Sequence, residues 1–446
     1  MSEQSTNKWR VVAPLGVAVV CGAVSGAAHA QSFITNDYAI PVLPDDPYVA
    51  RSGGPLESVA TLAVDGSVGA HYETNIFNAP SGAAVSDFVY TISPRAVVRI
   101  NGGNVEGRIE AGVDYARYAS HSENDQLDIF LRGNVDFAIS ENTTIMAQAS
   151  VKRDEAGITY NASNPDLTPN ETRTAILANA ELGVETRGQN FNFRAAVGVD
   201  VENYLNIQAT GDPFVQPDED DFVSPPINNH LRDNVTVYAN AEIGRNVGDE
   251  GEMFGGIEVA ASTFSNGGDA NPHRDSIIIE PYIGYSHESY DGAMVADARV
   301  GVAFQQFEND AYADLVIPTF DASVEWSPVG QNYSLYAATE TDIGSTITPG
   351  VGSAVSQTFE VGARSMINDR IELSGGLDGE YRVSRASALY GGDVDHTVNI
   401  GVGVGMKYFV QDHLYVAANA SYDTTFVDGG SNRNNAMFGV SLGADY

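Results

Sequence analysis

The chain ends in Phe438-Gly-Val-Ser-Leu-Gly-Ala-Asp-Tyr446, a stretch in which bulky apolar side chains alternate with small or polar ones. In an extended strand this places the apolar residues on one face and the glycines, Ser441 and Asp445 on the other. The same two-residue period recurs along almost the whole sequence, and no stretch after the N-terminal region is apolar enough for a membrane helix. The pattern predicts an all-β protein, a transmembrane antiparallel up-and-down β-barrel.

The N-terminus carries the features of an export signal. Lys8 and Arg10 precede the apolar run 11–24, and Ala28-His-Ala30 supplies the small residues that signal peptidase requires. We therefore expect a signal peptide over residues 1–30, cleaved near Ala30, a proline-containing periplasmic tail over 31–57, and a barrel over 58–446 in the Gram-negative outer membrane. The single cysteine, Cys21, falls in the expected leader, so no disulfide is expected.

The charge balance argues against a nucleic-acid partner. The chain has 59 acidic and 23 basic residues, and removal of Glu3, Lys8 and Arg10 with the leader leaves 58 and 21, a net charge of −37. Neutralising phosphates needs clustered Lys and Arg, which a chain of this charge does not offer. Most of the acid is expected in solvated loops, with a share that lines a pore.

Alternating segments divide the chain into about eighteen strands, with about sixteen as the alternative count. The predicted strands cover residues 58–72, 87–101, 105–119, 127–140, 143–154, 173–187, 190–203, 231–244, 252–265, 274–288, 293–307, 314–327, 333–343, 353–367, 370–383, 395–409, 413–424 and 434–446. Long connections, such as 73–86 and 204–230, alternate with short ones, such as 141–142 and 411–412. Outer-membrane barrels show this asymmetry, with long extracellular loops and short periplasmic turns, whereas a β-sandwich has no reason for it.

Period two also assigns the two faces of each strand, because lipid tolerates only apolar side chains whereas a wide barrel interior can hold water. In the strand 190–203, Phe191 and Phe193 face lipid and Arg194 faces inward. Arg117 has the outward parity, but it lies near a loop end where it can reach headgroups. The charged residues that we predict to line the lumen are Arg95, Arg99, Glu106, Arg108, Glu110, Asp114, Arg132, Asp136, Arg194, Arg299, Glu360, Arg364, Glu372 and Arg382.

Two interpretations of this charged wall are open at this point. In the first, Arg and carboxylate side chains of neighbouring strands satisfy one another in a hydrated interior. In the second, they form a polar track that hydrogen-bonds a passing hydrophilic solute without holding it. A barrel of about eighteen strands would leave an aqueous channel unless loops plug it.

The sequence offers no signature of catalysis or of a cofactor. The eight histidines are scattered without metal-ligand spacing, and no nucleophile elbow, P-loop or dinucleotide fingerprint occurs in a suitable context. The acidic run 218–221 lacks the ligand spacing of a calcium-binding loop. We therefore expect no enzyme, no bound metal and no cofactor.

The first hairpin and its continuation resemble a known family. Gly69-Ala-His-Tyr-Glu-Thr-Asn-Ile-Phe77 precedes Asp87-Phe-Val-Tyr-Thr-Ile-Ser-Pro-Arg-Ala-Val-Val-Arg99, and Val113-Asp-Tyr-Ala-Arg-Tyr118, Asn124-Asp-Gln-Leu-Asp128 and Ser140-Glu-Asn142 follow. These segments resemble outer-membrane β-barrel porins associated with exopolysaccharide and holdfast secretion, and Asn75 and Pro94 are the most specific part of the match. The resemblance implies a conduit for a secreted polysaccharide, with a periplasmic export protein as the partner that hands over the polymer.

Three functions follow as hypotheses. The resemblance favours polysaccharide export, and the architecture alone favours a general diffusion porin, for which an inward-folded loop over 204–230 would speak. A surface structural or adhesive barrel is the third, and a blocked lumen would support it. An acidic lumen would repel an anionic polymer, so we expect either a neutral or weakly charged substrate or a track of arginines on the early strands. The other expected partners are outer-membrane lipid, lipopolysaccharide and the barrel assembly machinery.

Overall fold

A computed structural model describes residues 60–157, 173–205, 233–265, 273–344, 351–386, 394–428 and 432–445. Its strands are β1 (Ala60–Glu73), β2 (Asp87–Gly102), β3 (Val105–Tyr118), β4 (Gln126–Ser140), β5 (Thr143–Ala156), β6 (Arg173–Arg187), β7 (Phe191–Tyr204), β8 (Asn234–Val247), β9 (Gly251–Phe264), β10 (Ser276–Glu288), β11 (Met294–Phe307), β12 (Leu315–Trp326), β13 (Tyr333–Gly344), β14 (Val351–Asn368), β15 (Ile371–Ala386), β16 (Val394–Gln411), β17 (Leu414–Val427) and β18 (Arg433–Asp445). The predicted leader and tail, the loop 206–232 and Tyr446 lie outside the described residues.

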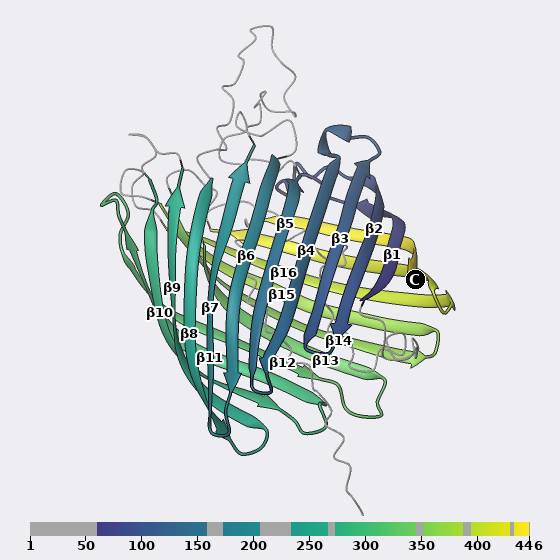
Figure 1. The fold of residues 1–446 in the computed structure, drawn as a ribbon. Helices are drawn as coiled ribbons and strands as arrows, with labels where there is room; N and C mark the ends of the chain where they lie inside the picture. The colour runs from purple at the N-terminus through teal and green to yellow at the C-terminus, as the bar shows by residue number, and fades with distance from the viewer. Residues whose placement is uncertain are drawn as a thin grey trace, which may run out of the picture.

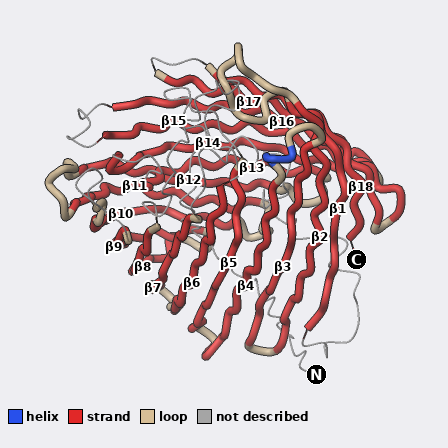
Figure 2. The backbone as a smooth tube through the Cα atoms, turned by 90° about the horizontal axis from the view of Figure 1, so that it is seen from above, coloured by secondary structure: helices blue, strands red, loops and turns tan. Residues whose placement is uncertain are grey.

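The eighteen strands form one antiparallel sheet in which each pairs with its neighbours in sequence, and β1 also pairs with β18. The sheet therefore closes into a barrel, whose front and back walls cross in Figure 1 and whose outline Figure 2 shows from above. Closure removes the free edges that an open sheet would present to lipid. The predicted fold class and strand number are confirmed.

In β18 the bulky apolar side chains lie on the outer face of the barrel, as the alternation in the sequence predicted. Phe438, Val440 and Leu442 are exposed on the outer wall, whereas Met437 is only 2% exposed. Leu442 lies opposite Val68 of β1, so the apolar outer surface continues across the closure. Among the described residues, no helix is both long enough and apolar enough to cross a membrane.

Short turns gather at one end of the barrel and longer connections at the other, called here the short-turn end and the long-loop end (Figure 1). Gly103 and Gly248 adopt φ angles of 53° and 74° in the turns after β2 and β8, a backbone conformation that glycine reaches without a Cβ penalty. Trp326 and Tyr333 flank another turn and meet edge to face, with ring centroids 5.9 Å apart. This placement agrees with an aromatic girdle at the membrane interface.

A hydrogen bond from the backbone to an aspartate, here called the aspartate clamp, recurs at four hairpins of the long-loop end. The sequence did not predict it. In each case the aspartate just before a strand accepts a hydrogen bond at Oδ1 from the backbone N–H of the aromatic residue that ends, or nearly ends, the preceding strand. The pairs are Tyr118 with Asp125 (2.8 Å), Tyr204 with Asp233 (2.7 Å), Phe264 with Asp275 (2.7 Å) and Phe307 with Asp314 (3.0 Å). Because the clamp holds the aspartate out of the ladder, β8 begins at Asn234 and β10 at Ser276, later than the predicted starts at 231 and 274.

The loop between β1 and β2 is anchored where the barrel closes. Asn75, 1% exposed, donates from Nδ2 to the carbonyl oxygens of Ala79 (2.8 Å) and Asn434 (3.0 Å), and its Oδ1 accepts from the backbone N–H of Ala79 (2.9 Å). Its own backbone N–H donates to Asn435 Oδ1 (3.1 Å), and Asn435 Nδ2 donates to Glu73 Oε1 (2.8 Å). Asn75, which the sequence singled out only by resemblance, thus ties the end of β1 to the start of β18.

Replacing Asn75 by Ala is expected to lower the free energy of unfolding by about 2 kcal/mol, because three side-chain hydrogen bonds at a buried site are lost. Urea unfolding in detergent micelles would measure the change. Asn104→Ala is the matched control, since Asn104 is exposed and makes one long contact, 3.5 Å from Nδ2 to Ala138 O, so its loss should stay within about 0.5 kcal/mol. Equal destabilisation by the two substitutions would contradict the anchoring role.

Candidate pore lining

The charged residues predicted for the lumen all occupy the inward parity of their strands. In β3, for example, Arg108 and Glu110 flank Ile109, which is exposed on the outer wall. Inward side chains of neighbouring strands stand side by side because the strand register brings them opposite one another. The wall therefore has to be described as clusters across strands rather than strand by strand.

Arginines of β2 to β4 form the first cluster. Glu110, 2% exposed, accepts hydrogen bonds from Arg108 (2.8 Å) and Arg132 (3.1 Å). The Phe130 ring lies between two guanidinium groups, with Arg95 Cζ 5.7 Å and Arg132 Cζ 5.5 Å from its centroid. Arg108 and Arg132 of the expected arginine track are thus engaged by the protein itself, whereas Nε and Nη2 of Arg95 have no hydrogen-bond partner among the described residues.

Arg194 of β7 is the centre of a second cluster that spans four strands. Its guanidinium donates to Glu185 of β6 (3.1 Å), to Glu252 of β9 (2.9 Å) and to Glu242 of β8. Glu185 also accepts from Arg187 (2.9 Å). An arginine side chain suits such a site, since its planar guanidinium group has five N–H donors and can bind three carboxylates at once.

The remaining predicted residues divide into paired and unpaired groups. Arg299 pairs with Asp321, Arg364 with Glu372, and Arg95 approaches Asp114 at 3.9 Å. Glu106 and Asp136 lie opposite each other in the register of β3 and β4. Arg99 and Arg382 form no ion pair with a described residue. The structural interpretation of the charged wall therefore fits most of the arginines, while several carboxylates, such as Glu106 and Asp136, form no ion pair within the described ranges.

Glu360, Asp378 and Asp423 form one layer across β14, β15 and β17, here called the acid layer. Glu360 lies opposite Asp378 in the register, and Asp378 and Asp423 lie opposite Gly401 of β16 from its two sides. A Cβ at Gly401 would stand 2.5 Å from Asp378 Oδ1 and 2.7 Å from Asp423 Oδ1, so both carboxylates lean over the glycine. Oε1 of Glu360, Oδ1 of Asp378 and Oδ2 of Asp423 are buried without a hydrogen-bond partner in the described part of the chain.

Glu360 of the acid layer belongs to the predicted pore lining, whereas Asp423 and the three carboxylate partners of Arg194 were not predicted. Inward parity was available as a signal for Asp423, which alternates with the outward Tyr422. The grouping itself was not available, because register decides which carboxylates meet. Across the described ranges, no cluster of His, Cys, Asp and Glu has the arrangement of a metal site.

A closed barrel that is apolar outside and charged inside defines an outer-membrane β-barrel of the porin and transporter type. The chain belongs to the family described as Putative beta-barrel porin 2, whose model matches residues 62–445. No curated protein matches the chain.

Several solved structures resemble the barrel at low identity. The siderophore receptor PirA from Acinetobacter baumannii is 9% identical, with a TM-score of 0.43 over 86% of this chain and 80% of that one. OpdK from Pseudomonas aeruginosa, solved with vanillate, is 10% identical, with a TM-score of 0.42 over 86% of this chain and 99% of that one.

Proposed function

We propose that the chain is an outer-membrane conduit through which an extracellular polysaccharide leaves the cell, and that this polymer is neutral or positively charged. The observation that carries the proposal is the unequal state of the two charges in the lumen. Arg108, Arg132 and Arg194 are held by carboxylates, whereas the acid layer forms no ion pair with any residue that the structure describes. Carboxylate oxygens accept hydrogen bonds from sugar hydroxyl and ammonium groups, and they repel anions.

The engaged arginines speak against the alternative of an arginine track for an acidic polymer. Arg108 and Arg132 share the carboxylate of Glu110, and Arg194 donates to three carboxylates, so these guanidinium groups have fewer donors left for a passing anion. A periplasmic export protein as partner and a leader cleaved near Ala30 are parts of the same proposal. N-terminal sequencing of the membrane-inserted protein would test the leader, with Gln31 as the expected first residue.

A clean deletion strain tests the conduit. We expect surface and extracellular polysaccharide to disappear in the deletion and to return with the intact gene. Amino-sugar and uronic-acid analysis of the recovered polymer then tests the charge, and a polymer rich in uronic acid would contradict the acidic-lumen argument. As a matched pair for complementation, the acid-layer variant Glu360→Gln, Asp378→Asn, Asp423→Asn should export less polymer than a variant that loses three exposed turn acids, Glu141→Gln, Asp369→Asn, Asp412→Asn.

The second candidate function is a general diffusion porin for small hydrophilic solutes, which the family membership and the polar wall also favour. The deletion strain distinguishes polysaccharide export from solute diffusion. Unchanged polymer together with slower uptake of small sugars would support diffusion and overturn export. Unchanged polymer and unchanged uptake would count against both.

A further inference from the structure

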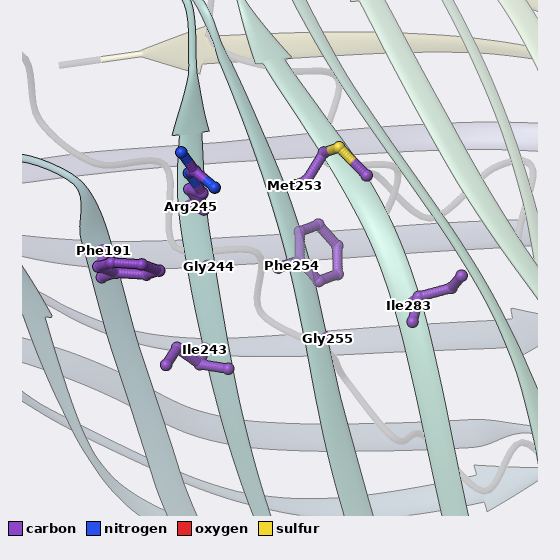
Figure 3. Close-up of a pocket in the computed structure, with 8 residues that line it drawn as sticks. All are labelled: Phe191, Ile243, Gly244, Arg245, Met253, Phe254, Gly255 and Ile283. Carbon is purple, nitrogen blue, oxygen red and sulfur yellow. The ribbon is translucent and has the colours of Figure 1, made fainter.

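An apolar groove lies on the outer wall near the short-turn ends of β7 to β9, extending to β10 (Figure 3). Its volume is about 320 Å³, and its outward lining consists of Phe191, Ile243, Arg245, Met253, Gly255 and Ile283. The four large apolar side chains in this set are each more than half exposed. The groove therefore faces the membrane and not the lumen.

Gly255 creates the hollow. It lies opposite Ile243 of β8 on one side and Ile283 of β10 on the other, so its missing side chain leaves a gap between two isoleucines. A Cβ built there would meet Tyr282 O at 3.6 Å and Ile283 Cγ2 at 3.7 Å, which are ordinary contact distances. The space is thus available to a ligand, and a side chain at this position would fill it without strain.

Arg245 places a positive charge at the end of this groove. It lies opposite Phe191 and Met253 in the register, two residues before the end of β8, and its Cζ is 6.0 Å from the centroid of the Phe191 ring. Arg245 is exposed and forms no ion pair with any residue of the described ranges. An outward-facing arginine without an ion pair is unusual in a chain of net charge −36. Because Arg245 lies close to the end of its strand, its guanidinium can reach the level of the lipid headgroups.

We propose that the groove retains one glycerophospholipid of the periplasmic leaflet, with its phosphate on Arg245 and an acyl chain against Ile243, Gly255 and Ile283. The short-turn end of this class of barrel faces the periplasm, and a guanidinium binds phosphate oxygens in a bidentate manner. A second copy of the chain is a poorer occupant, because a stable protein interface needs about 800 Å² per partner and the groove is lined by only six outward residues. The site is independent of the solute that the lumen carries.

Native mass spectrometry of the intact barrel in detergent, titrated with dioleoyl phosphatidylglycerol, tests the site. We expect one lipid per barrel to be retained, and Arg245→Gln to weaken its binding about fivefold. Gly255→Val, which fills the hollow and keeps the charge, should abolish retention. Arg117→Gln is the matched control, since Arg117 is also exposed, outward-facing and without a described ion pair, but lies at the long-loop end of β3.

The folded state of each variant is verified by its heat-modifiable shift on gel electrophoresis. Lipid occupancy of folded Arg245→Gln and Gly255→Val equal to that of the wild type would overturn the proposal. It would also be overturned if the wild-type barrel were a dimer that Gly255→Val separates while lipid occupancy stays the same, because the groove would then be an interface between copies.

Discussion

Neutralising the acid layer as Glu360→Gln, Asp378→Asn, Asp423→Asn is expected to reduce the preference of the pore for K⁺ over Cl⁻ about tenfold. A unit charge about 8 Å from a permeating ion contributes about 0.5 kcal/mol at the dielectric of water, so three charges contribute about 1.5 kcal/mol. Screening by about 0.1 M salt removes roughly half of this. Because the carboxylates attract K⁺ and repel Cl⁻ equally, the remaining energy counts twice in the ratio, which gives the tenfold effect. The reversal potential of the barrel in a planar bilayer, under a KCl gradient, gives the ratio directly.

The control for this measurement removes three carboxylates without touching the lumen wall. Glu141, Asp369 and Asp412 are exposed in short turns, and their neutralisation changes the net charge of the protein by the same amount. It should leave the reversal potential nearly unchanged. A wild-type pore that prefers Cl⁻, or equal shifts from the two triple variants, would show that the acid layer does not set the selectivity.

Replacing Arg194 by Met is expected to cost about 2 kcal/mol of barrel stability, because Glu185, Glu242 and Glu252 would face one another without their common cation. Breaking a buried ion pair by removing one partner costs about 3–5 kcal/mol, and the 32% exposure of the Arg194 side chain lowers that figure. The temperature at which the folded gel band converts to the unfolded band measures the loss.

Arg187→Met is the matched control for Arg194. Arg187 donates to the same Glu185, but its side chain is 55% exposed and it contacts one carboxylate instead of three. An exposed pair of this kind contributes below about 1 kcal/mol. If the two substitutions destabilised the barrel equally, the four-strand cluster would have no special role, and the wall would be a set of independent surface pairs.

The Arg194 cluster and the acid layer differ in whether their charges are paired. The Arg194 cluster uses its cation to hold β6 to β9 together, so that part of the wall is structural. The acid layer on β14, β15 and β17 has no such partner among the described residues, and its three side chains are only partly buried. The interior thus separates a part that maintains the barrel from a part available to a solute.

The strand order, the closed architecture and the two faces of each strand could be read from the sequence because they depend on a local period. Alternation such as that of Phe438, Val440 and Leu442 needs no knowledge of any other strand. The inward parity of Arg194 or Glu360 follows in the same way. The strand ends were also predicted to within three residues.

Tertiary structure decided which inward residues meet. The register across strands places Glu242 and Glu252 on Arg194, Asp378 beside Glu360, and Gly255 between two isoleucines, and none of these neighbours is close in sequence. Period two fixes only on which face of its strand a side chain lies, whereas the shift between strands fixes its height and its neighbours. The sequence by itself therefore determined a membrane barrel with a polar interior. The register between neighbouring strands decided which charged side chains form ion pairs, which do not, and where the outer wall has a hollow.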